Sequence, residues 1–202
     1  MNPTVSLEGF LNLVPEKPVV WNEIFGNQNP IEVEIGCGKG LFLLARAQEN
    51  PGINFLGFDR AIKWLRRRQK RAADENVVNL KFSRMEAQDF IPNIPADSVN
   101  IFHIYFPDPW PKRRHHSRRL IEVKFLTLLL EKTAAGGSIF LATDDMDYFK
   151  QMQRSVALLK GDFESRQSHE RMIGPIKTTY ESKFASAGLI LNYMEIKKKE
   201  RI

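Results

Sequence analysis

The chain has 202 residues, of which 43% are hydrophobic and 27% are charged, so it is long enough to bury one sizeable core and is predicted to form one domain. Thirty Lys and Arg against 24 Asp and Glu give a net charge of +6, which favours partners that carry phosphate. One cysteine excludes an internal disulfide, no Cys/His spacing resembles a zinc site, and no apolar run approaches the roughly 20 residues that span a bilayer. We therefore expect a cytoplasmic protein without metal or membrane contact, either a monomer or a homodimer.

Residues 1–30 read as an irregular lead-in with scattered prolines and one predicted helical turn, and regular alternation of strands and helices begins at Ile31. The predicted strands are Ile31–Ile35, Ile53–Phe58, Val77–Phe82, Val99–Phe106, Ser138–Ala142 and Leu189–Ile196. The predicted helices are Trp21–Phe25, Leu41–Gln48, Ala61–Asp74, Leu120–Lys132 and a segment with Tyr148, Met152, Val156 and Leu159 on one face. This alternation predicts an α/β fold with a doubly wound, mostly parallel sheet, formed by residues 31–202 as a single domain.

A glycine turn, Glu34–Gly40, directly follows the first predicted strand and opens a helix. Glycines such as Gly36 and Gly38 let the backbone bend tightly and approach a ligand closely. Asp59 ends the second strand at about the 20-residue spacing where an acid hydrogen-bonds a ribose. Leu41 stands where a dinucleotide-binding turn has its third glycine, so the spacing favours S-adenosylmethionine over a pyrophosphate cofactor.

Two further acids lie near this turn in the predicted sheet. Glu34 is placed to face the cationic sulfonium of such a cofactor. Glu86, just after the third strand, is either an adenine-binding acid or a solvated surface charge.

The segment Pro107–Lys112 follows the strand Val99–Phe106, and its three prolines exclude a helix or a central strand there. We expect a stiff loop that holds Asp108 between two prolines. A cationic cluster follows at once: Arg113, Arg114, His115, His116, Arg118 and Arg119. A held acid beside this cluster predicts a site for an anionic polymer. The alternative is a solvated turn before a basic helix.

Together these segments resemble the bacterial tRNA (guanine-N7)-methyltransferases, S-adenosylmethionine-dependent enzymes with the Rossmann-like class I methyltransferase fold. The resemblance covers roughly residues 20–196 and is most specific in Phe106–His116; Thr143-Asp144 and Thr178–Glu181 also agree in order and spacing. Ser117 stands where the family has a basic residue, Asp59 where Glu is common and Glu86 where Asp is common. The resemblance implies methyl transfer to N7 of a guanine in the variable loop of tRNA.

The resemblance also implies roles for individual residues. The cofactor would be bound by Glu34, Asp59, Glu86 and Asp108 with the glycine turn at Gly36 and Gly38, and the guanine and its RNA would be met by Lys112, Asp144, Thr178, Thr179, Tyr180 and Glu181. Because N7 already carries an in-plane lone pair, alignment and electrostatics should dominate over base catalysis. Asp108 is the catalytic candidate: its charge would stabilise the methylated purine or hold the cofactor's amino group, and both roles stay open.

Asp144 and Glu181 could accept hydrogen bonds from guanine's Watson–Crick edge. The alternatives are a helix N-terminal acid for Asp144 and an ordinary surface charge for Glu181.

RNA backbone contacts are predicted for the loop 112–119, including Arg113 and Arg114, and for a cationic helix face that includes Arg67 and Arg71. Trp110 is predicted to pack as an anchor of the loop and not to stack on a base. Three rival functions remain: a methyltransferase acting on another RNA, a protein or a small molecule; a nicotinamide oxidoreductase; and an RNA-binding module without catalysis. A methyltransferase acting on a protein or a small molecule would not need two basic clusters. A nicotinamide oxidoreductase would want a glycine at position 41, where this chain has Leu41, and an RNA-binding module would have no use for Glu34 and Asp59 around a glycine turn.

Overall fold

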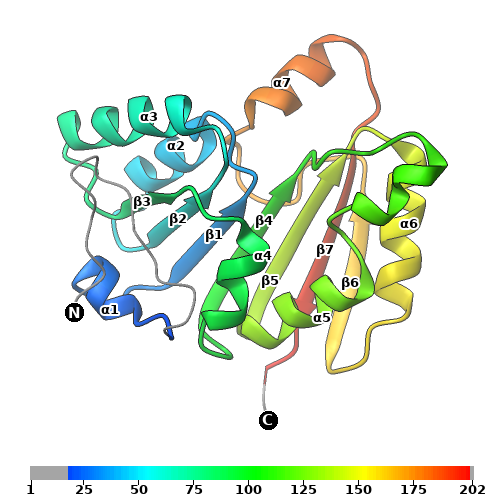
Figure 1. Ribbon diagram of the computed structural model, residues 1–202, viewed down its shortest axis with the longest axis horizontal. Helices are drawn as coiled ribbons and strands as arrows, with labels where there is room; N and C mark the ends of the chain where they lie inside the picture. Colours follow the sequence, from blue (N-terminus) through cyan, green and yellow to red (C-terminus); the bar gives the residue numbers. More distant parts are fainter. Residues whose placement is uncertain (1–17, 201–202) are drawn as a thin grey trace.

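The computed structural model describes residues 18–200 and places them in one sheet covered by helices on both faces (Figure 1). The strands are β1 (Ile31–Ile35), β2 (Asn54–Phe58), β3 (Leu80–Ser83), β4 (Val99–Tyr105), β5 (Thr133–Thr143), β6 (Phe163–Ser168) and β7 (Asn192–Lys198). The helices are α1 (Trp21–Phe25), α2 (Leu41–Glu49), α3 (Ile62–Asp74), α4 (Ala87–Phe90), α5 (Val123–Lys132), α6 (Met146–Ala157) and α7 (Thr179–Ser186), with 3-10 turns η1 (Ile91–Asn93) and η2 (Arg113–Arg118).

The seven-stranded sheet has the order β3-β2-β1-β4-β5-β7-β6. The five strands from β3 to β5 pair in parallel, whereas β7 runs antiparallel between β5 and β6. The predicted α/β fold with a doubly wound, mostly parallel sheet is therefore confirmed. The chain order reverses between β1 and β4, and ligands bind at this position in doubly wound sheets, outside the carboxyl ends of the strands.

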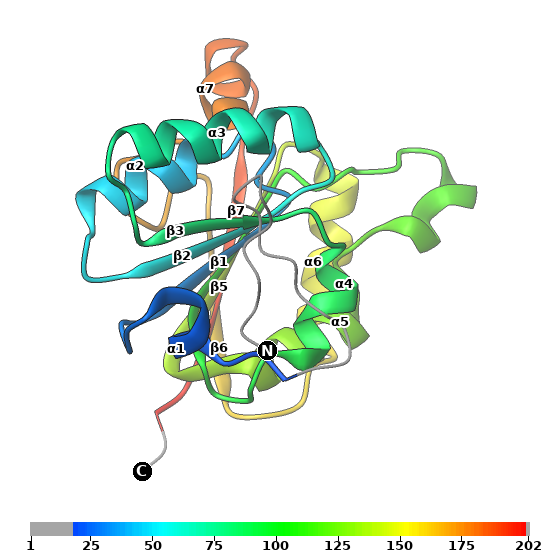
Figure 2. The same ribbon diagram turned by 60° about the vertical axis from the view of Figure 1, so that its left-hand side comes forward.

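Two hydrophobic clusters pack against the two faces of the sheet. One contains side chains of α1, α4, α5 and α6, including Phe90, Leu126 and Tyr148. The other contains side chains of α2 and α3, including Phe42 and Leu65. Figure 2 shows α2 and α3 on one side of the sheet and α4, α5 and α6 on the other. Strand β1 is buried along its whole length, so its two acids lie in the interior.

The observed bounds differ from the predicted ones at a few elements. Strand β6 is absent from the predicted strands, because its side chains are mostly exposed at the sheet edge and show no hydrophobic alternation. Strand β5 begins at Thr133, ahead of the predicted Ser138, and β3 begins at Leu80 after the predicted Val77. Residues 1–17 of the predicted lead-in lie outside the described residues, and Val19 and Ile24 belong to the core.

Candidate active site

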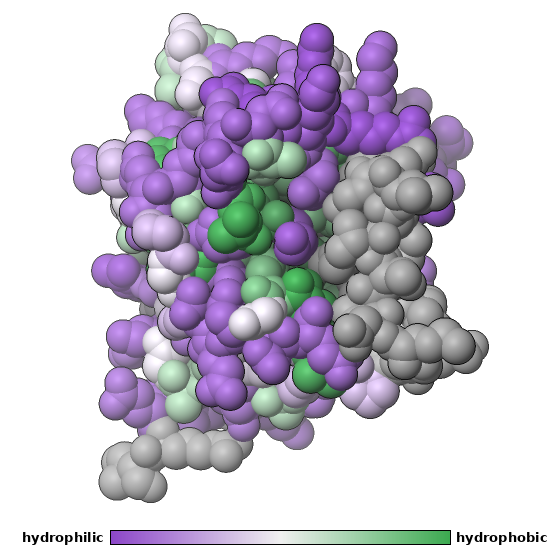
Figure 3. All heavy atoms as spheres, turned by 90° about the vertical axis from the view of Figure 1, so that its left-hand side faces the viewer, coloured by the Kyte–Doolittle hydropathy of each residue, from purple (hydrophilic) through white to green (hydrophobic). Residues whose placement is uncertain are grey.

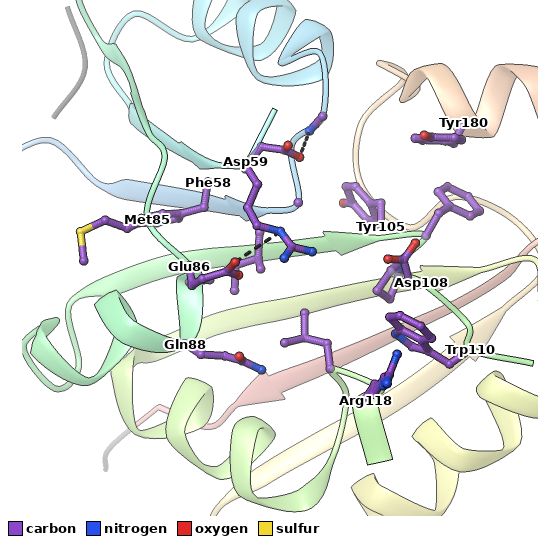
Figure 4. A pocket seen from close by; sticks show the side chains of 18 residues that line it. Phe58, Asp59, Met85, Glu86, Gln88, Tyr105, Asp108, Trp110, Arg118 and Tyr180 are labelled. Atoms are coloured by element: carbon purple, nitrogen blue, oxygen red, sulfur yellow. Dashed lines mark hydrogen bonds and ion pairs between the residues drawn. The ribbon is translucent and has the colours of Figure 1, made fainter. Parts of the chain in front are cut away.

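A cavity of about 550 Å³ opens at the carboxyl ends of β1, β2 and β4. Ile35, Phe58 and Tyr105, the last residues of these three strands, line it. Figure 4 shows Asp59 and Glu86 on one side of the cavity and Asp108 and Trp110 on the other. The candidate acids from separate parts of the chain therefore meet at one edge of the sheet, as the parallel topology predicts.

The glycine turn forms one wall of this cavity through Gly36 and Gly38. Both residues have a positive φ, 79° and 53°, which side-chain-bearing residues adopt at a cost. A Cβ atom at either position would meet nothing within 4 Å, so glycine is required there by backbone conformation and also leaves open space for a ligand. The backbone N–H groups of Gly36 and Cys37 both donate to the carbonyl of Phe58, which holds the turn against the end of β2.

The carboxylate of Asp59 braces the glycine turn. Its Oδ2 accepts a hydrogen bond of 2.7 Å from the N–H of Gly38, and its Oδ1 accepts one of 2.8 Å from the N–H of Ala61, at the start of α3. Each carboxylate oxygen has a second acceptor position, and Asp59 lines the cavity (Figure 4). The sequence spacing placed Asp59 near the turn, but it did not reveal this bracing role.

We expect Asp59→Ala to weaken S-adenosylmethionine binding by about 1.5–3 kcal/mol, because a charged hydrogen-bonding partner of the ligand is lost. The variant also loses the hydrogen bond that the Gly38 N–H donates to Asp59 and that holds the glycine turn, and this loss weakens binding further. Titration calorimetry on the folded variant measures it, and Asp74→Ala, an exposed acid at the end of α3, is the matched control. Equal affinities of the Asp59 variant and wild type would remove Asp59 from the cofactor site.

Glu34 lies in the interior beneath the glycine turn, with only 4% of its surface exposed. Its Oε2 finds no hydrogen-bonding partner among residues 18–200. Burial, reinforced by the nearby negative charge of Asp59, raises the pKa of the Glu34 carboxyl to about 8. A cation placed near this carboxyl would favour its charged form. The expectation that Glu34 faces a sulfonium stays a prediction, since the residue lies next to the lining residues Ile35 and Gly36 and does not itself line the cavity.

A buried chain of polar contacts fixes Tyr105 at the cavity. Arg46 binds both oxygens of Glu32, at 2.9 and 2.7 Å, and Oε2 of Glu32 lies 2.9 Å from Nε2 of His103. Burial would raise the pKa of Glu32, but the hydrogen bonds from His103 and Arg46 hold it below its usual value. Burial also lowers the pKa of His103. A neutral His103 then donates to Glu32 through Nε2 and accepts through Nδ1 from the Tyr105 hydroxyl, 2.8 Å away.

The loop that carries Asp108 has unusual backbone conformations on both sides of this residue. Phe106 and Trp110 have φ values of 54° and 45°, and bulky residues in this region cost on the order of 1–3 kcal/mol each. Asp108 and Trp110 both line the cavity. Trp110 also packs within the loop, with the ring of His115 edge-on at 5.8 Å and the guanidinium of Arg118 over its face at 5.0 Å. It is thus both a loop anchor, as predicted, and a wall of the cavity.

The basic segment after the loop is helical. The prolines prevent regular structure as far as Lys112, and the 3-10 turn η2 begins at the next residue. Arg113 and Arg114 are exposed there, as backbone-binding cations must be. Lys112 is exposed and lies outside the cavity lining. Arg119, in contrast, is buried, so the expectation that the whole loop 112–119 presents cations to RNA is wrong at this residue.

The segment Thr178–Glu181 starts helix α7, which lies near the carboxyl ends of the parallel strands (Figure 1). Thr178 and Glu181 form a capping box at the helix start. The carboxylate of Glu181 is 1% exposed and binds Arg171 at 2.5 and 2.6 Å and the Tyr193 hydroxyl at 2.9 Å. The alternative of an ordinary surface charge is therefore wrong for Glu181, and its predicted contact with guanine would require these partners to move.

The other residues predicted to contact the substrate are more exposed to solvent than Glu181. Tyr180 is 52% exposed and lines the cavity, while Thr179 is exposed beside it. Asp144 is half-buried, and the neighbouring Asp145, not Asp144, caps α6 by accepting from the Tyr148 N–H at 2.7 Å. Glu86 lines the cavity and pairs with Arg60 at 3.3 Å (Figure 4). Glu86 at this position can be an adenine-binding acid or a solvated surface charge, so both alternatives from the sequence stay open.

Residues 18–200 hold no group of three or more His, Cys, Asp or Glu side chains that could bind a metal ion. None of the helices within these residues is both long and apolar enough to cross a membrane.

The fold and the cavity define the class of protein. A doubly wound sheet with a glycine turn after β1, and acids after β2, β3 and β4 around one cavity, is the arrangement of a class I methyltransferase. Solved structures share the fold: the 16S rRNA (adenine(1408)-N(1))-methyltransferase of Catenulisporales acidiphilia superposes with a TM-score of 0.62 at 16% identity, covering 94% of this chain and 93% of that one. An rRNA methylase of Streptococcus thermophilus gives a TM-score of 0.56 at 14% identity, covering 88% and 91%.

Sequence relatives define the family more narrowly. A family model described as putative methyltransferase matches residues 28–191. The tRNA (guanine-N(7)-)-methyltransferase of Rubrobacter xylanophilus is 32% identical over 86% of this chain and 79% of its own length, and that of Bacillus subtilis is 33% identical over 83% and 80%. The Geobacter metallireducens enzyme is 41% identical over 65% of this chain and 63% of its own length. This chain belongs to the tRNA (guanine-N7)-methyltransferase family.

Proposed function

We propose that this protein transfers a methyl group from S-adenosylmethionine to the N7 atom of a guanine in the variable loop of tRNA. The observation that carries the proposal is the cavity between the braced glycine turn and the Asp108 loop, with exposed arginines directly after that loop. The names of the relatives supply the guanine and the tRNA. A cytoplasmic location is part of the proposal, because tRNA is the substrate.

The cavity suits the proposed cofactor. Gly36 and Gly38 leave room at its wall, and the buried Glu34 oxygen without a hydrogen bond within the described residues lies next to that wall. Phe58 and Met85 add apolar surface between Asp59 and Glu86. When bound, S-adenosylmethionine supplies an electrophilic methyl group on a cationic sulfonium. Asp59 and Glu86 would accept hydrogen bonds from its hydroxyl and amino groups.

The reaction needs little from the protein beyond placement and charge. Guanine N7 would attack the methyl carbon with its own lone pair while the bond from that carbon to sulfur breaks and the neutral thioether leaves, so no residue has to remove a proton beforehand. The purine becomes positively charged as the bond forms, and a fixed carboxylate at Asp108 stabilises that charge. The strained and proline-bounded loop holds the Asp108 backbone in one place, so little reorganisation is needed during the reaction. Tyr180, exposed on the α7 side of the same cavity, is a candidate contact for the base.

Two basic surfaces would hold the RNA backbone. One is the exposed face of α3 with Lys63, Arg67 and Lys70, and the other is η2 with Arg113 and Arg114. Figure 3 shows hydrophilic side chains covering the upper part of the face on which α3 lies. Arg71 on the same helix forms an ion pair of 2.6 Å with Glu75, which reduces its free charge. We therefore expect Arg67 to contribute more than Arg71 to RNA binding.

Replacing Arg67 and Arg71 together by Gln should reduce the salt dependence of tRNA binding by about one unit of slope per lost phosphate contact. The slope is obtained from dissociation constants measured at several salt concentrations. Lys160→Gln with Lys197→Gln is the matched control, because both lysines are exposed at the opposite end of the sheet. If the slope is the same in both double variants, the α3 face is solvated surface only.

The proposed function is tested by transfer of tritiated methyl from S-adenosylmethionine to bulk tRNA, followed by nuclease digestion and identification of the labelled nucleoside. We expect 7-methylguanosine from the variable loop. Label in another nucleoside, in ribosomal RNA or in protein would replace the proposal with one of the other methyltransferase functions. Absence of transfer despite tight tRNA binding would favour an RNA-binding module.

A further inference from the structure

Arg119 is the one arginine of the segment 112–119 that the structure buries, with 4% of its surface exposed. Its guanidinium makes three hydrogen bonds: Nε donates to the carbonyl of Pro109 at 2.7 Å, Nη1 to Oε1 of Gln151 at 2.8 Å, and Nη2 to Oδ2 of Asp147 at 2.7 Å. It also lies 4.9 Å from the ring centre of Tyr148. The last three partners all belong to α6, so Arg119 links this helix to the loop that carries Asp108.

Besides the ring contacts of Phe106 and Trp110, the loop has few ways to be held. Pro107, Pro109 and Pro111 have no backbone N–H to donate. On the upstream side, the N–H of Phe106 donates to the carbonyl of Ala142 in β5 at 2.8 Å. On the downstream side, the carbonyl of Pro109 accepts from Arg119. These two contacts bracket Asp108.

The backbone at the upstream contact and just after the downstream contact favours other conformations. Phe106 and Trp110 both have positive φ values, and such conformations persist only where the surroundings enforce them. Loss of the downstream contact therefore lets the loop relax, and Asp108 and Trp110 move with it.

We propose that Arg119 is a positioning residue for methyl transfer, which keeps Asp108 directed into the cavity by anchoring the Pro109 carbonyl to α6. The inference rests on the proposed function. It separates Arg119 from Arg113 and Arg114, which have the same side chain in the same basic segment but are exposed. Arg119 acts on the rate of the reaction, and the exposed arginines act on tRNA affinity.

Lysine cannot reproduce this contact, because its single ammonium lacks the planar fork that reaches three acceptors at fixed angles. Arg119→Lys keeps the positive charge and most of the volume. We expect its single-turnover rate, with cofactor and tRNA saturating, to fall roughly 10- to 100-fold, since a displacement of about 1 Å at a reacting centre can cost about 100-fold. The dissociation constant for tRNA should stay within about twofold of wild type, because a buried arginine makes no phosphate contact.

Arg154→Lys is the matched control, because Arg154 is an exposed arginine on α6. We expect it to keep the wild-type rate. Asp147→Asn weakens the anchor from the other side without emptying a buried position, since the Asp147 side chain is 62% exposed. It should lower the rate about two- to fivefold, as expected for loss of an exposed ion pair. If Arg119→Lys does not fold, the rate of Asp147→Asn tests whether the Arg119 anchor positions the loop.

A second measurement reports on the loop independently of activity. Hydrogen–deuterium exchange of the peptide 105–112 should be faster in Arg119→Lys than in wild type and Arg154→Lys, because the loop has lost its downstream contact. Rate loss together with faster exchange and unchanged tRNA affinity supports the proposal. A folded Arg119→Lys variant with a wild-type rate, with weakened tRNA binding alone, or with rate loss but unchanged exchange overturns it. If wild-type protein methylates no tRNA, the proposed function fails, and the exchange experiment still decides whether Arg119 anchors the loop.

Discussion

Asp108→Asn is expected to lower the rate constant of methyl transfer by on the order of 100-fold or more, by analogy with the loss of a preorganised charge partner. The substitution keeps the shape of the side chain and removes its negative charge, which would face the purine as it becomes cationic. Single-turnover transfer to tRNA, with enzyme and cofactor saturating, measures the effect. A role confined to the cofactor would appear mainly as a raised KM for S-adenosylmethionine with a smaller change in kcat.

The control for this experiment is Asp162→Asn, an exposed acid in the connection before β6. It should behave as wild type. Affinity for tRNA should change little in both variants, because neither side chain is cationic. An Asp108→Asn rate within a few-fold of wild type would remove Asp108 from the residues required for catalysis.

Arg171→Ala is expected to lower the free energy of unfolding by about 3–5 kcal/mol, because it leaves a buried carboxylate without its charge partner. The side chains of Arg171 and Glu181 are 9% and 1% exposed and lie 2.5 Å apart. Arg171 also donates to the carbonyls of Ile173 and Gly174, so its loss loosens the segment before α7. Urea unfolding followed by circular dichroism gives the free energy.

Arg71→Ala is the comparison for Arg171→Ala, because it breaks an exposed pair four residues apart on α3. That loss should be only about 0.3–0.5 kcal/mol. Replacing both partners, as Arg171→Met with Glu181→Gln, should cost less than Arg171→Ala alone, since no unpaired buried charge remains. If Arg171→Ala is no more destabilising than Arg71→Ala, the buried pair does not stabilise α7.

The segments predicted best are those in which local signals agree. The strand Ile31–Ile35 was predicted with its observed bounds, because its alternating apolar residues meet a glycine turn that no regular element can continue. The edge strand β6 was missed, since its mostly exposed side chains give no alternation and its position depends on pairing with β7. The early start of β5 was missed for a related reason, because Gly136 and Gly137 in its first half resemble a turn.

The acids around the cavity were found because topology alone brings the carboxyl ends of parallel strands together. Roles that depend on tertiary contacts were beyond sequence reasoning. Arg113 and Arg119 belong to one basic run, and only the fold exposes the first and buries the second. Glu181 looked like a surface or substrate-facing acid, because its partner Arg171 lies in a polar stretch without a recognisable pattern. A charged residue inside an apolar strand, such as Glu32, was the available signal for the network behind Tyr105.

The antiparallel insertion of β7 and the switch between β1 and β4 also bear on how the chain reaches its native state. Glu32 meets His103 across 71 residues, and Ser138 meets Glu195 across 57. Such distant pairings require large loops to close before they yield stabilising contacts, which slows folding. Strand β4 leads into the Asp108 loop and is flanked by β1 and β5, so the cavity forms only after separate regions of the chain have paired. S-adenosylmethionine can therefore stabilise the completed sheet but cannot guide the early collapse, because its binding surface does not yet exist then.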